Sequence, residues 1–341
     1  MKRLLIVTDA WHPQINGVVR TLERTRDELR KLGLGVTVLA PDQFRTVPLP
    51  TYPEIRLVVA PPGEVRDAIA AARADHIHIA TEGPLGFIAR RWAINHRSPF
   101  TTSFHTRFPE YLRKRIPIPE AWSYAWLRHF HNAGLGCMVA TESLEKELAS
   151  RGFLHLMRWT RGVDPELFRP GPSTLFDDLP RPVFITVGRV APEKNLDAFL
   201  SLDLPGSKVV VGNGPALAAL QASYPDVRFL GYREGEALAE AYRAANVFVF
   251  PSRTDTFGIV LLEALASGLP IAAYPVTGPA DVIGSAGVGV LDEDLHHAAL
   301  SALEIPREQC RAFALDHSWG RSARQFLDNV LAARARMSEA A

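Results

Sequence analysis

The first forty residues alternate between short apolar runs and one stretch of helical spacing. Leu4–Val7 is an apolar run bounded by polar residues, a pattern typical of a buried strand. After Gly17, apolar residues recur every three or four positions up to Lys31, as expected of an amphipathic helix. A second run rich in β-branched residues, Val36–Leu39, follows at once. The pattern predicts a β-α-β unit, and therefore a parallel sheet, at the start of the chain.

The same alternation returns in the second half of the chain. Each short apolar run is followed by a stretch with helical spacing, which predicts further β-α units on one parallel sheet. Two such series predict an α/β protein with two Rossmann-like, doubly wound domains. The second series has expected strands at Val183–Val187, Lys208–Val211, Val227–Leu230 and Val247–Phe250, and expected helices at Asn195–Leu202, Pro215–Ser223, Glu236–Ala244 and Ile259–Ala266.

The two series are separated by residues 161–182, which hold five prolines, two glycines and no long periodic run. This composition is typical of an interdomain linker. We therefore predict an N-terminal domain at residues 1–168, a linker at 169–182 and a C-terminal domain at 183–318. Residues 319–341 are helical in pattern and could pack on either domain, which includes a return to the N-terminal one.

Composition and charge narrow the class of protein. The 341 residues are 47% hydrophobic and 22% charged, which argues against a disordered or collagen-like chain. The net charge is +1, yet residues 1–170 carry 24 basic and 17 acidic residues, whereas residues 171–341 carry 14 and 20. The basic first half is therefore the better candidate to face an anionic surface, such as anionic lipid.

The cysteines and the N-terminus indicate the compartment. Cys137 and Cys310 are the only cysteines and lie far apart, which argues against a disulfide scaffold and fits a reducing environment. Asp9 and His12 interrupt the first apolar run too early for a signal peptide. No stretch approaches the ~18 apolar residues of a transmembrane helix. We expect a cytoplasmic protein, peripheral on the inner face of the membrane.

Two strand ends are followed by residues suited to binding phosphate. Asn16 and Gly17 begin the first helix, where backbone N–H groups can approach an anion, although a plain turn glycine explains Gly17 equally well. Arg189 and Lys194 follow a predicted strand, at the edge where open α/β sheets bind ligands. Arginine can bind a diphosphate in a bidentate manner and lysine adds a point charge, so the two could neutralise a leaving nucleoside diphosphate without a metal. The alternative is a pair of ordinary surface cations.

Two acidic residues, Asp255 and Glu263, lie eight positions apart around the start of a predicted apolar helix. Glu263 falls within the apolar face, where a carboxylate needs partners such as sugar hydroxyls. Asp255 lies near the helix N-terminus, where a carboxylate could instead serve as a structural cap. The two residues together favour a sugar-binding site.

The string from Phe250 to Pro270 resembles the signature of glycosyltransferase family 4, in which an acidic residue, seven residues and a Glu bind the donor sugar nucleotide. Members of this family are retaining enzymes of the GT-B architecture, with two Rossmann-like domains facing across a cleft. The resemblance extends from the first strand to Trp319. Other short motifs of the family occur in the same order along the chain: Asn16-Gly17, Ser103-Phe104-His105-Thr106, Arg161-Gly-Val-Asp164, Gly188-Arg189 with Lys194-Asn195, and Gly212-Asn-Gly214.

The resemblance implies a donor site, mostly on the C-terminal domain. Arg189 and Lys194 would hold the diphosphate, and Glu263 would bind the ribose hydroxyls. The other implied donor-binding residues would hold the transferred sugar or lie near the base. The implied donor-binding residues are Asn16, Gly17, Arg189, Lys194, Leu230, Tyr232, Asp255, Phe257, Gly258, Ile259 and Glu263.

The resemblance also implies a catalytic set of His105, Arg189, Lys194 and Asp255. His105 would reach the donor sugar from the N-terminal domain. The acceptor would attack on the face that the diphosphate leaves, with the departing phosphate taking its proton; a covalent intermediate on Asp255 is the alternative. Many members have Glu where this chain has Asp255, which leaves the identity of the sugar open.

Three further segments are similar to sequences of a branch of the family that makes membrane glycolipids: Thr8–Thr21, Glu82–Gly86 and Phe108–Tyr111. This branch comprises sulfoquinovosyl-, glucosyl- and glucuronosyl-diacylglycerol synthases and lipid α-mannosyltransferases. A basic cluster followed by aromatic residues supports a membrane acceptor, because such segments lie on anionic bilayers. The alternative is a helix that packs its aromatics into the core. The residues expected at the membrane or acceptor are Arg113, Lys114, Arg115, Trp122 and Trp126.

We therefore expect an enzyme that transfers a hexose or hexuronic acid from a nucleoside diphosphate sugar to a lipid hydroxyl, as on diacylglycerol or a simple glycolipid. A GDP-mannose- or UDP-glucose-dependent transferase acting on a soluble saccharide is the closest alternative. His76 and His78 share one strand face without further ligands, so we predict no protein-bound metal, and no cofactor or nucleic acid is expected. The base, the sugar and the oligomeric state stay open.

Overall fold

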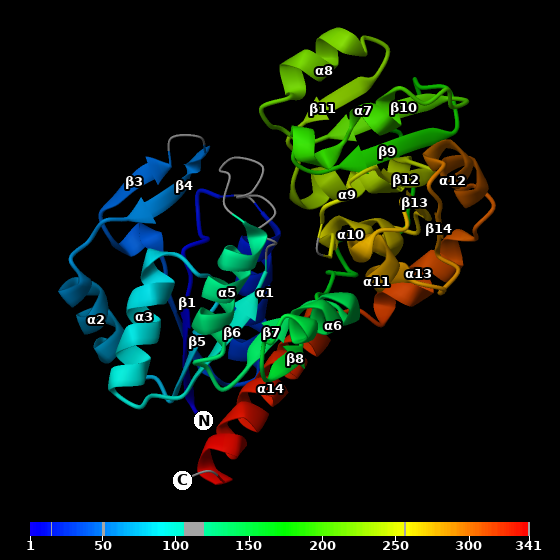
Figure 1. Cartoon of the computed structure of the whole chain (residues 1–341). Helices are drawn as coiled ribbons and strands as arrows, with labels where there is room; N and C mark the ends of the chain where they lie inside the picture. Colours follow the sequence, from blue (N-terminus) through cyan, green and yellow to red (C-terminus); the bar gives the residue numbers. More distant parts are fainter. Residues whose placement is uncertain (15, 50–51, 106–118, 256, 340–341) are drawn as a thin grey trace. The chain divides into compact units, whose positions relative to one another are not determined.

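The computed structural model describes residues 1–14, 16–49, 52–105, 119–255 and 257–339. The residues of the chain group by their mutual contacts into two compact units. Figure 1 shows the chain coloured along the sequence from the N-terminus to the C-terminus. The first unit is Met1–Thr160 together with Trp319–Ala341, and the second is Arg161–Ser318. Residues 161–168 thus group with the second unit, and the C-terminal helix groups with the first.

The first unit contains a six-stranded parallel sheet with the order β2-β1-β5-β6-β7-β8. The chain passes from β1 to β2 on one side and then returns to β5 on the other side of β1, so the strand order reverses between β1 and β5. The strands are β1 (Arg3–Val7), β2 (Gly35–Leu39), β5 (His76–Ile79), β6 (Phe100–Phe104), β7 (Cys137–Val139) and β8 (Leu156–Arg158), and β3 (Thr46–Leu49) pairs separately and antiparallel with β4 (Tyr52–Val58).

Helices cover both faces of this sheet because successive strand residues point to opposite sides. Leu4 and Ile6 of β1 pack with the helices of one face, whereas Leu5 and Val7 pack with those of the other. The first face carries α1 (Gly17–Lys31) and α14 (Trp319–Glu339), and the second carries α2 (Pro62–Ala71), α3 (Pro84–Asn95), α5 (Glu120–His131) and α6 (Glu142–Ser150).

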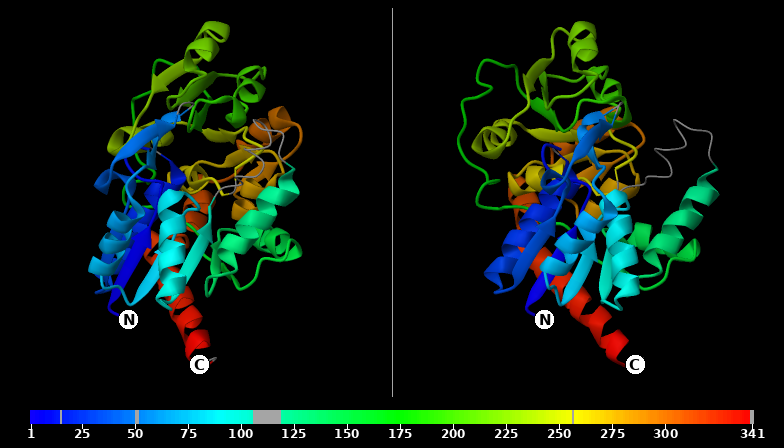
Figure 2. Two further views of the ribbon diagram at one scale, coloured as in Figure 1. Left: turned by 60° about the vertical axis from the view of Figure 1, so that its left-hand side comes forward. Right: turned by 90° about the vertical axis from the view of Figure 1, so that its left-hand side faces the viewer.

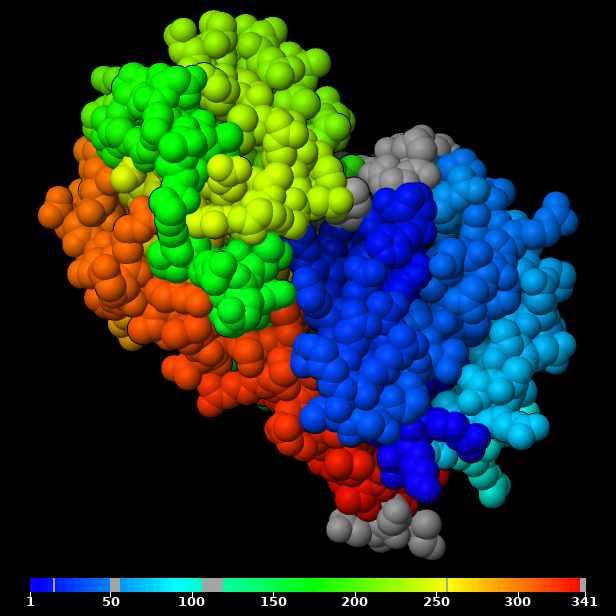
Figure 3. Space-filling model, turned by 180° about the vertical axis from the view of Figure 1, so that it is seen from behind, coloured from blue at the N-terminus to red at the C-terminus, as the bar shows by residue number. Residues whose placement is uncertain are grey.

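The C-terminal helix α14, whose place the sequence left open, packs on the first unit. Its Phe326 is fully buried beside Trp159, with ring centroids 4.9 Å apart. The Trp159 indole N–H donates to Ser322 Oγ at 3.2 Å, and Gln325 Oε1 accepts from the Thr160 backbone N–H at 2.8 Å. In both views of Figure 2, α14 (red) runs along this unit toward the N-terminus, and Figure 3 shows it beside α1 (blue).

The second unit contains another six-stranded parallel sheet, with the order β11-β10-β9-β12-β13-β14. Here the chain passes from β9 out to β10 and β11 and returns to β12 on the other side of β9. The strands predicted at Val183–Val187 and Val247–Phe250 are confirmed to the residue. The remaining strands are β10 (Ser207–Val211), β11 (Arg228–Gly231), β13 (Ile271–Ala273) and β14 (Gly289–Leu291).

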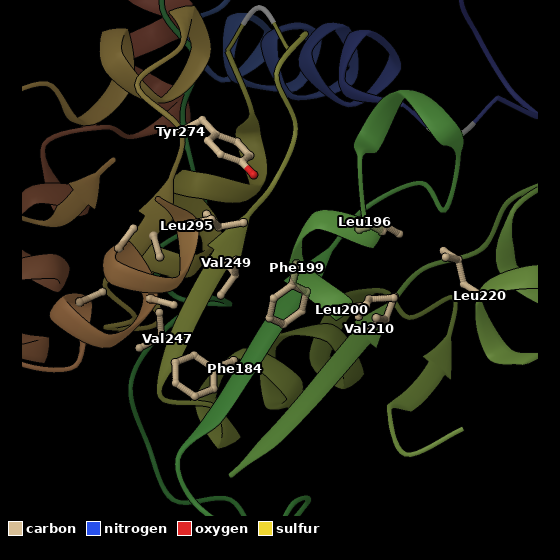
Figure 4. Close-up of a cluster of buried hydrophobic side chains, with 14 of the residues drawn as sticks. Phe184, Leu196, Phe199, Leu200, Val210, Leu220, Val247, Val249, Tyr274 and Leu295 are labelled. Atoms are coloured by element: carbon tan, nitrogen blue, oxygen red, sulfur yellow. The ribbon is translucent and has the colours of Figure 1, made fainter. Parts of the chain in front are cut away.

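This sheet is also covered on both faces. Figure 4 shows Phe184, Val247 and Val249 of the strands pointing toward Phe199 and Leu295 of the helices on one face. That face carries α7 (Asp197–Leu200), α8 (Leu217–Ser223) and α12 (Leu295–Ala302). Three other helices of the unit pack against one another: α9 (Gly235–Ala244), α10 (Ile259–Ala266) and α13 (Arg307–Leu315). The last helix, α11 (Thr277–Ile283), contacts β14.

The prediction of two doubly wound, parallel α/β domains is therefore confirmed. Within the described part of the chain, no helix combines the length and the hydropathy needed to span a bilayer.

Candidate active site

The point where the strand order reverses in the second unit marks the candidate active site. In open α/β sheets, ligands bind outside the carboxyl ends of the strands at this point, because the connecting loops leave in opposite directions there. In this unit the reversal lies between β9 and β12. The loop after β9 contains Arg189 and Lys194, and the loop after β12 contains Asp255.

The structure brings Lys194 and Asp255 together across these two loops. Lys194 Nζ lies 2.5 Å from Asp255 Oδ1, and the side chains are 26% and 20% exposed. The other carboxylate oxygen, Asp255 Oδ2, is buried and has no hydrogen-bond partner among the described residues. A buried carboxylate oxygen without a donor is costly, and a donor from a ligand would offset that cost. The geometry therefore indicates a site for a hydroxyl or other hydrogen-bond donor at Asp255.

The loop that carries Arg189 and Lys194 is held at both ends. The Gly188 backbone N–H donates to the Val211 carbonyl at 3.0 Å, and Asn195 Nδ2 donates to the Pro251 carbonyl at 3.1 Å. Between them, a short 3₁₀ turn at Pro192–Lys194 presents the lysine, and Asn195 has a left-handed backbone with φ +54°. Arg189 is partly exposed on the same loop.

Close approach of two loops requires glycine at Gly212, which follows β10. A Cβ built there would lie 1.8 Å from the Gly188 carbonyl oxygen, and φ is +145°. A Cβ at Gly188, by contrast, would meet no atom within 4 Å. The backbone at Gly188 thus borders open space, as expected where a phosphate approaches a glycine-rich turn.

Asp255 does not cap α10, so the structural alternative raised from the sequence is wrong. The N-cap of α10 is Gly258, in a left-handed conformation with φ +82°, and no described side chain caps the helix. Phe257 is buried and Ile259 begins the helix. The first-turn amides of α10 therefore have no side-chain acceptor in the described part of the unit.

Glu263 lies deeper than a surface sugar contact, at 1% exposure on α10. The hydroxyl of Tyr242, on α9, donates to Glu263 Oε2 at 3.2 Å. The sequence analysis missed Tyr242, because a tyrosine on an apolar helix face gives no sign of which carboxylate it meets. The ribose-binding role of Glu263 stays a prediction.

Two further predicted donor residues lie at the end of β11, two strands from β9. Leu230 is half-buried, and Tyr232 is 41% exposed. The Tyr232 hydroxyl donates to Glu234 Oε2 at 2.8 Å. An exposed aromatic ring at this edge suits stacking on a base, and this role also stays a prediction.

The other predicted donor and catalytic residues belong to the first unit. Asn16 caps α1, and its side-chain oxygen accepts from the backbone N–H groups of Val18 and Val19 at 3.0 Å each. Gly17 is exposed at the first position of α1. His105 follows β6, with its ring 5.7 Å from the Trp159 ring.

His76 and His78 are buried polar residues of β5 that bond to hydroxyls of β6. His76 Nε2 and His78 Nδ1 each lie 3.0 Å from Thr101 Oγ1, and His78 Nε2 lies 2.7 Å from Ser103 Oγ. Burial, with a smaller effect of Arg334, lowers the pKa of His76 to about 3. Among the described residues, no group of three or more His, Cys, Asp or Glu could hold a metal ion.

The expected membrane residues divide into two groups. Arg113, Lys114 and Arg115 lie outside the described residues. Trp122 and Trp126 of α5 are 72% and 45% exposed. Two other aromatics of the segment, at positions 124 and 130, are instead buried in the core, so the helix packs one face inward and presents the tryptophans on another.

The sequence analysis did not single out Asp9, which lies where the strand order of the first unit reverses. Its carboxylate accepts from Thr81 Oγ1 and the Leu85 backbone N–H at 2.9 Å each, and from the Gly86 N–H at 3.3 Å. Burial raises the pKa of Asp9 to about 6, although these hydrogen bonds favour the charged form. A Cβ at Gly83 would lie 2.3 Å from Asp9 Cγ, so any larger residue there would displace the Asp9 carboxylate.

Known proteins resemble the chain over both units. A family model described as Glycosyltransferase Family 4 matches residues 15–167, and one described as Glycosyl transferases group 1 matches residues 181–305. The GDP-mannose-dependent alpha-mannosyltransferase of Mycobacterium tuberculosis is 30% identical over 318 residues, 85% of this chain and 83% of that protein. The chain belongs to glycosyltransferase family 4. This family 4 protein is a nucleotide-sugar-dependent hexosyltransferase, as the sequence analysis predicted.

Other relatives match the glycolipid branch of family 4. The sulfoquinovosyl transferase of Arabidopsis thaliana is 31% identical over 292 residues, 75% of this chain and 56% of that protein. The alpha-monoglucosyldiacylglycerol synthase of Streptococcus pneumoniae is 24% identical over 348 residues, 88% and 78% of the two chains. The solved structure of Anabaena HepE with UDP and glucose has a TM-score of 0.74 at 16% identity, covering 97% of this chain and 100% of that one, which confirms the GT-B fold.

Proposed function

We propose that this family 4 enzyme moves a hexose or hexuronic acid from a nucleoside diphosphate sugar to a lipid hydroxyl, with retention of anomeric configuration. The observation that carries the proposal is the Lys194–Asp255 pair at the reversal point of the second sheet, where Asp255 Oδ2 has no hydrogen-bond partner among the described residues. A buried acceptor atom beside a fixed cation suits a ligand with hydroxyls on one side and negative charge on the other. A sugar joined to a diphosphate has both features.

The reaction places opposite charges on the two halves of the donor. As the bond from the sugar to the diphosphate lengthens, positive charge develops on the sugar and negative charge on the leaving group. Lys194 and Arg189 would stabilise the leaving diphosphate, and Asp255 would hold a sugar hydroxyl through Oδ2. The acceptor oxygen forms the new bond to the anomeric carbon on the same face, and its proton goes to the departing phosphate. No bound metal is part of this proposal.

The exposed tryptophans of α5 support a lipid acceptor. Trp122 and Trp126 are spaced four residues apart, so they lie on the same face of the helix, and Trp126 packs at 5.0 Å from the Phe87 ring. Tryptophan is favoured where one end of a side chain meets lipid and the other water. Among the relatives, the name of the pneumococcal enzyme includes diacylglycerol.

A soluble acceptor is the second candidate, because the names of the mycobacterial relatives specify GDP-mannose but no lipid. One experiment separates the two. The purified protein is incubated in turn with labelled UDP-glucose, UDP-glucuronate, UDP-galactose and GDP-mannose, with diacylglycerol in anionic vesicles. We expect label in the organic phase with one donor, and an α-linkage by NMR. Label confined to water-soluble glycosides would assign the acceptor to the soluble class.

The variant Asp255→Asn serves as the chemical control for this assay. It keeps the size of the side chain and removes the charge that pairs with Lys194. We expect product formation to fall to a few per cent or less. A covalent intermediate is excluded if Asp255→Asn retains more than a few per cent of the normal rate.

A further inference from the structure

An ion pair joins a buried ring to a partly exposed carboxylate in the first unit. His131 Nε2 lies 3.0 Å from Glu82 Oε1. The His131 side chain is fully buried, whereas the Glu82 side chain is 22% exposed. The two residues are 49 positions apart, at the end of α5 and in the loop between β5 and α3. The pair therefore connects the interior to the edge of the sheet.

Glu82 lies at the edge where an open α/β sheet binds ligands. It follows β5, one of the two strands between which the order of the first sheet reverses. Asp9 occupies the same edge, but its two oxygens accept three hydrogen bonds from Thr81, Leu85 and Gly86. In the described structure the Glu82 carboxylate is bonded through Oε1 to His131, which leaves Oε2 for another donor.

The His131 ring is held by hydrogen bonds at both nitrogens and by packing against aromatic rings. Its Nδ1 lies 2.8 Å from Thr102 Oγ1, so both ring nitrogens have partners. The ring also lies among aromatic side chains, with centroids 5.2 Å from Phe130 and 5.8 Å from Phe153. The position at the end of α5 favours a positive charge, because the last carbonyls of a helix carry partial negative charge.

The charge state of His131 follows from these surroundings. Burial alone disfavours the protonated ring, but Cys137 and the hydrogen-bonded Glu82 carboxylate favour it, and the pKa is raised to about 10. A protonated ring donates through both nitrogens, to Thr102 and to Glu82. The hydrogen bond from His131 therefore holds the Glu82 side chain in one orientation.

Stability alone gives little reason for such a pair. The attraction between two charges in the interior is offset by the loss of their hydration, so a buried ion pair contributes little net free energy of folding. A surface carboxylate without a partner would be freely mobile. A carboxylate with one oxygen fixed and the other available at a ligand-binding edge is suited to recognising a ligand.

We propose that Glu82 binds hydroxyl groups of the acceptor, and that His131 is a positioning residue that holds Glu82 for this purpose. The inference rests on the proposed function and extends it to the chemistry of the acceptor. A carboxylate accepts hydrogen bonds from hydroxyls and repels phosphate. The part of the acceptor next to Glu82 is therefore an uncharged polyol, such as the glycerol of a diacylglycerol or the ring hydroxyls of a glycolipid, and not a phosphorylated headgroup.

The test compares Glu82→Gln with a matched control, Glu147→Gln, in the full-length protein. Glu147 is 24% exposed and pairs with Arg151, but it lies on α6 and not at the sheet edge. The acceptor is dioctanoylglycerol in phosphatidylcholine vesicles, with the donor that the labelling experiment selects. We expect Glu82→Gln to raise the acceptor KM at least tenfold, with nucleotide affinity and donor hydrolysis without acceptor within twofold of normal.

The variant His131→Gln tests the positioning role. We expect a similar rise in acceptor KM with unchanged nucleotide affinity, and a smaller effect of Glu82→Asp, which retains the charge. If His131→Gln does not fold, Glu82→Gln decides alone, because the Glu82 side chain is partly exposed and its replacement keeps its size.

An unchanged acceptor KM in Glu82→Gln, with an active wild-type protein, overturns this inference and leaves the proposed function intact. A faster reaction on phosphatidylinositol phosphate than on dioctanoylglycerol also overturns it. A wild-type protein that binds no nucleotide and consumes no donor would instead refute the proposed function and this inference with it.

Discussion

Each unit contains a doubly wound parallel sheet, but the two sheets differ in the chemistry of the edge at which the strand order reverses. In each, the chain returns past its first strand, and the order reverses between β1 and β5 in one unit and between β9 and β12 in the other. At the second edge, glycine backbone borders open space beside the cationic Lys194. At the first edge lie two carboxylates held by hydrogen bonds, those of Asp9 and Glu82.

This difference suggests how one fold serves two substrates. Backbone without side chains and fixed cations suit a diphosphate, which needs close approach and positive charge. Carboxylates held by donors suit neutral hydroxyls and exclude phosphate by repulsion. We therefore assign the donor to the second unit and the acceptor to the first, as part of the proposed function.

The largest effect is expected from removing the cations of the second edge. Lys194→Ala or Arg189→Ala should lower turnover by ~10²-fold or more, because each removes a charge that acts on the developing diphosphate. Steady-state kinetics with the selected donor measures this effect. Lys146→Ala, at a surface lysine paired with Glu142 in the first unit, is the control and should leave turnover unchanged. Near-normal rates in both active-site variants would place the phosphate elsewhere.

The glycine at the second edge gives the next effect. Gly212→Ala places a Cβ against the Gly188 carbonyl and should destabilise the protein by roughly 3 kcal/mol, through the clash and the strained backbone. Gly63→Ala in α2, where a Cβ meets nothing within 4 Å, should change the stability little. Urea unfolding monitored by fluorescence compares the two. Equal stability of both variants would show that the loops after β9 and β10 do not need their close contact.

The buried imidazole of His76, in the first unit, should make the free energy of unfolding depend on pH. The pKa of His76 is about 3 in the folded protein, so the unfolded chain takes up the proton first as the pH falls below 6.5. Stability present above pH 6.5 is therefore lost toward pH 3, by roughly 3 kcal/mol between pH 7 and pH 4. His76→Gln should flatten this slope in urea unfolding at several pH values, whereas His129→Gln, at an exposed position, should not. An identical slope in His76→Gln contradicts the assignment.

The smallest effect is expected at the exposed tryptophans of the first unit. Replacing Trp122 and Trp126 by Ser should weaken binding to anionic vesicles about tenfold, because interfacial contact buries only part of each ring. Leu154→Ser, at another exposed apolar position, should have no such effect. Sedimentation with vesicles measures both. Unchanged sedimentation of the double variant would remove α5 from the membrane account.

The fold could be predicted from the sequence wherever a local pattern was complete. The strands Val183–Val187 and Val247–Phe250 and the helix Ile259–Ala266 were predicted to the residue, because each is an apolar run bounded by turn or polar residues. The place of α14 could not be predicted, since an amphipathic helix shows that one face is buried but not against what. Only the contacts of Phe326 and Trp159 decided it.

The candidate site could be predicted only in part, for the same physical reason. Motif spacing indicated Lys194 and Asp255 separately as ligand-binding residues. It did not predict their contact, because the two residues lie 61 positions apart in different loops. His131 was missed because it lies in an aromatic segment that suggested a membrane surface, and its partner Glu82 lies 49 positions earlier, in the loop between β5 and α3. Periodicity predicts which side of an element is buried, not which side chains meet there.

The contrast between the two edges is tested most directly by one set of titrations. Isothermal titration with UDP and GDP and the acceptor KM are measured on wild type, Lys194→Ala and Glu82→Gln. The account predicts that Lys194→Ala loses nucleotide affinity, and that Glu82→Gln keeps nucleotide affinity but loses acceptor affinity. Loss of nucleotide affinity in Glu82→Gln, or its full retention in Lys194→Ala, would contradict the assignment of donor and acceptor to the two units.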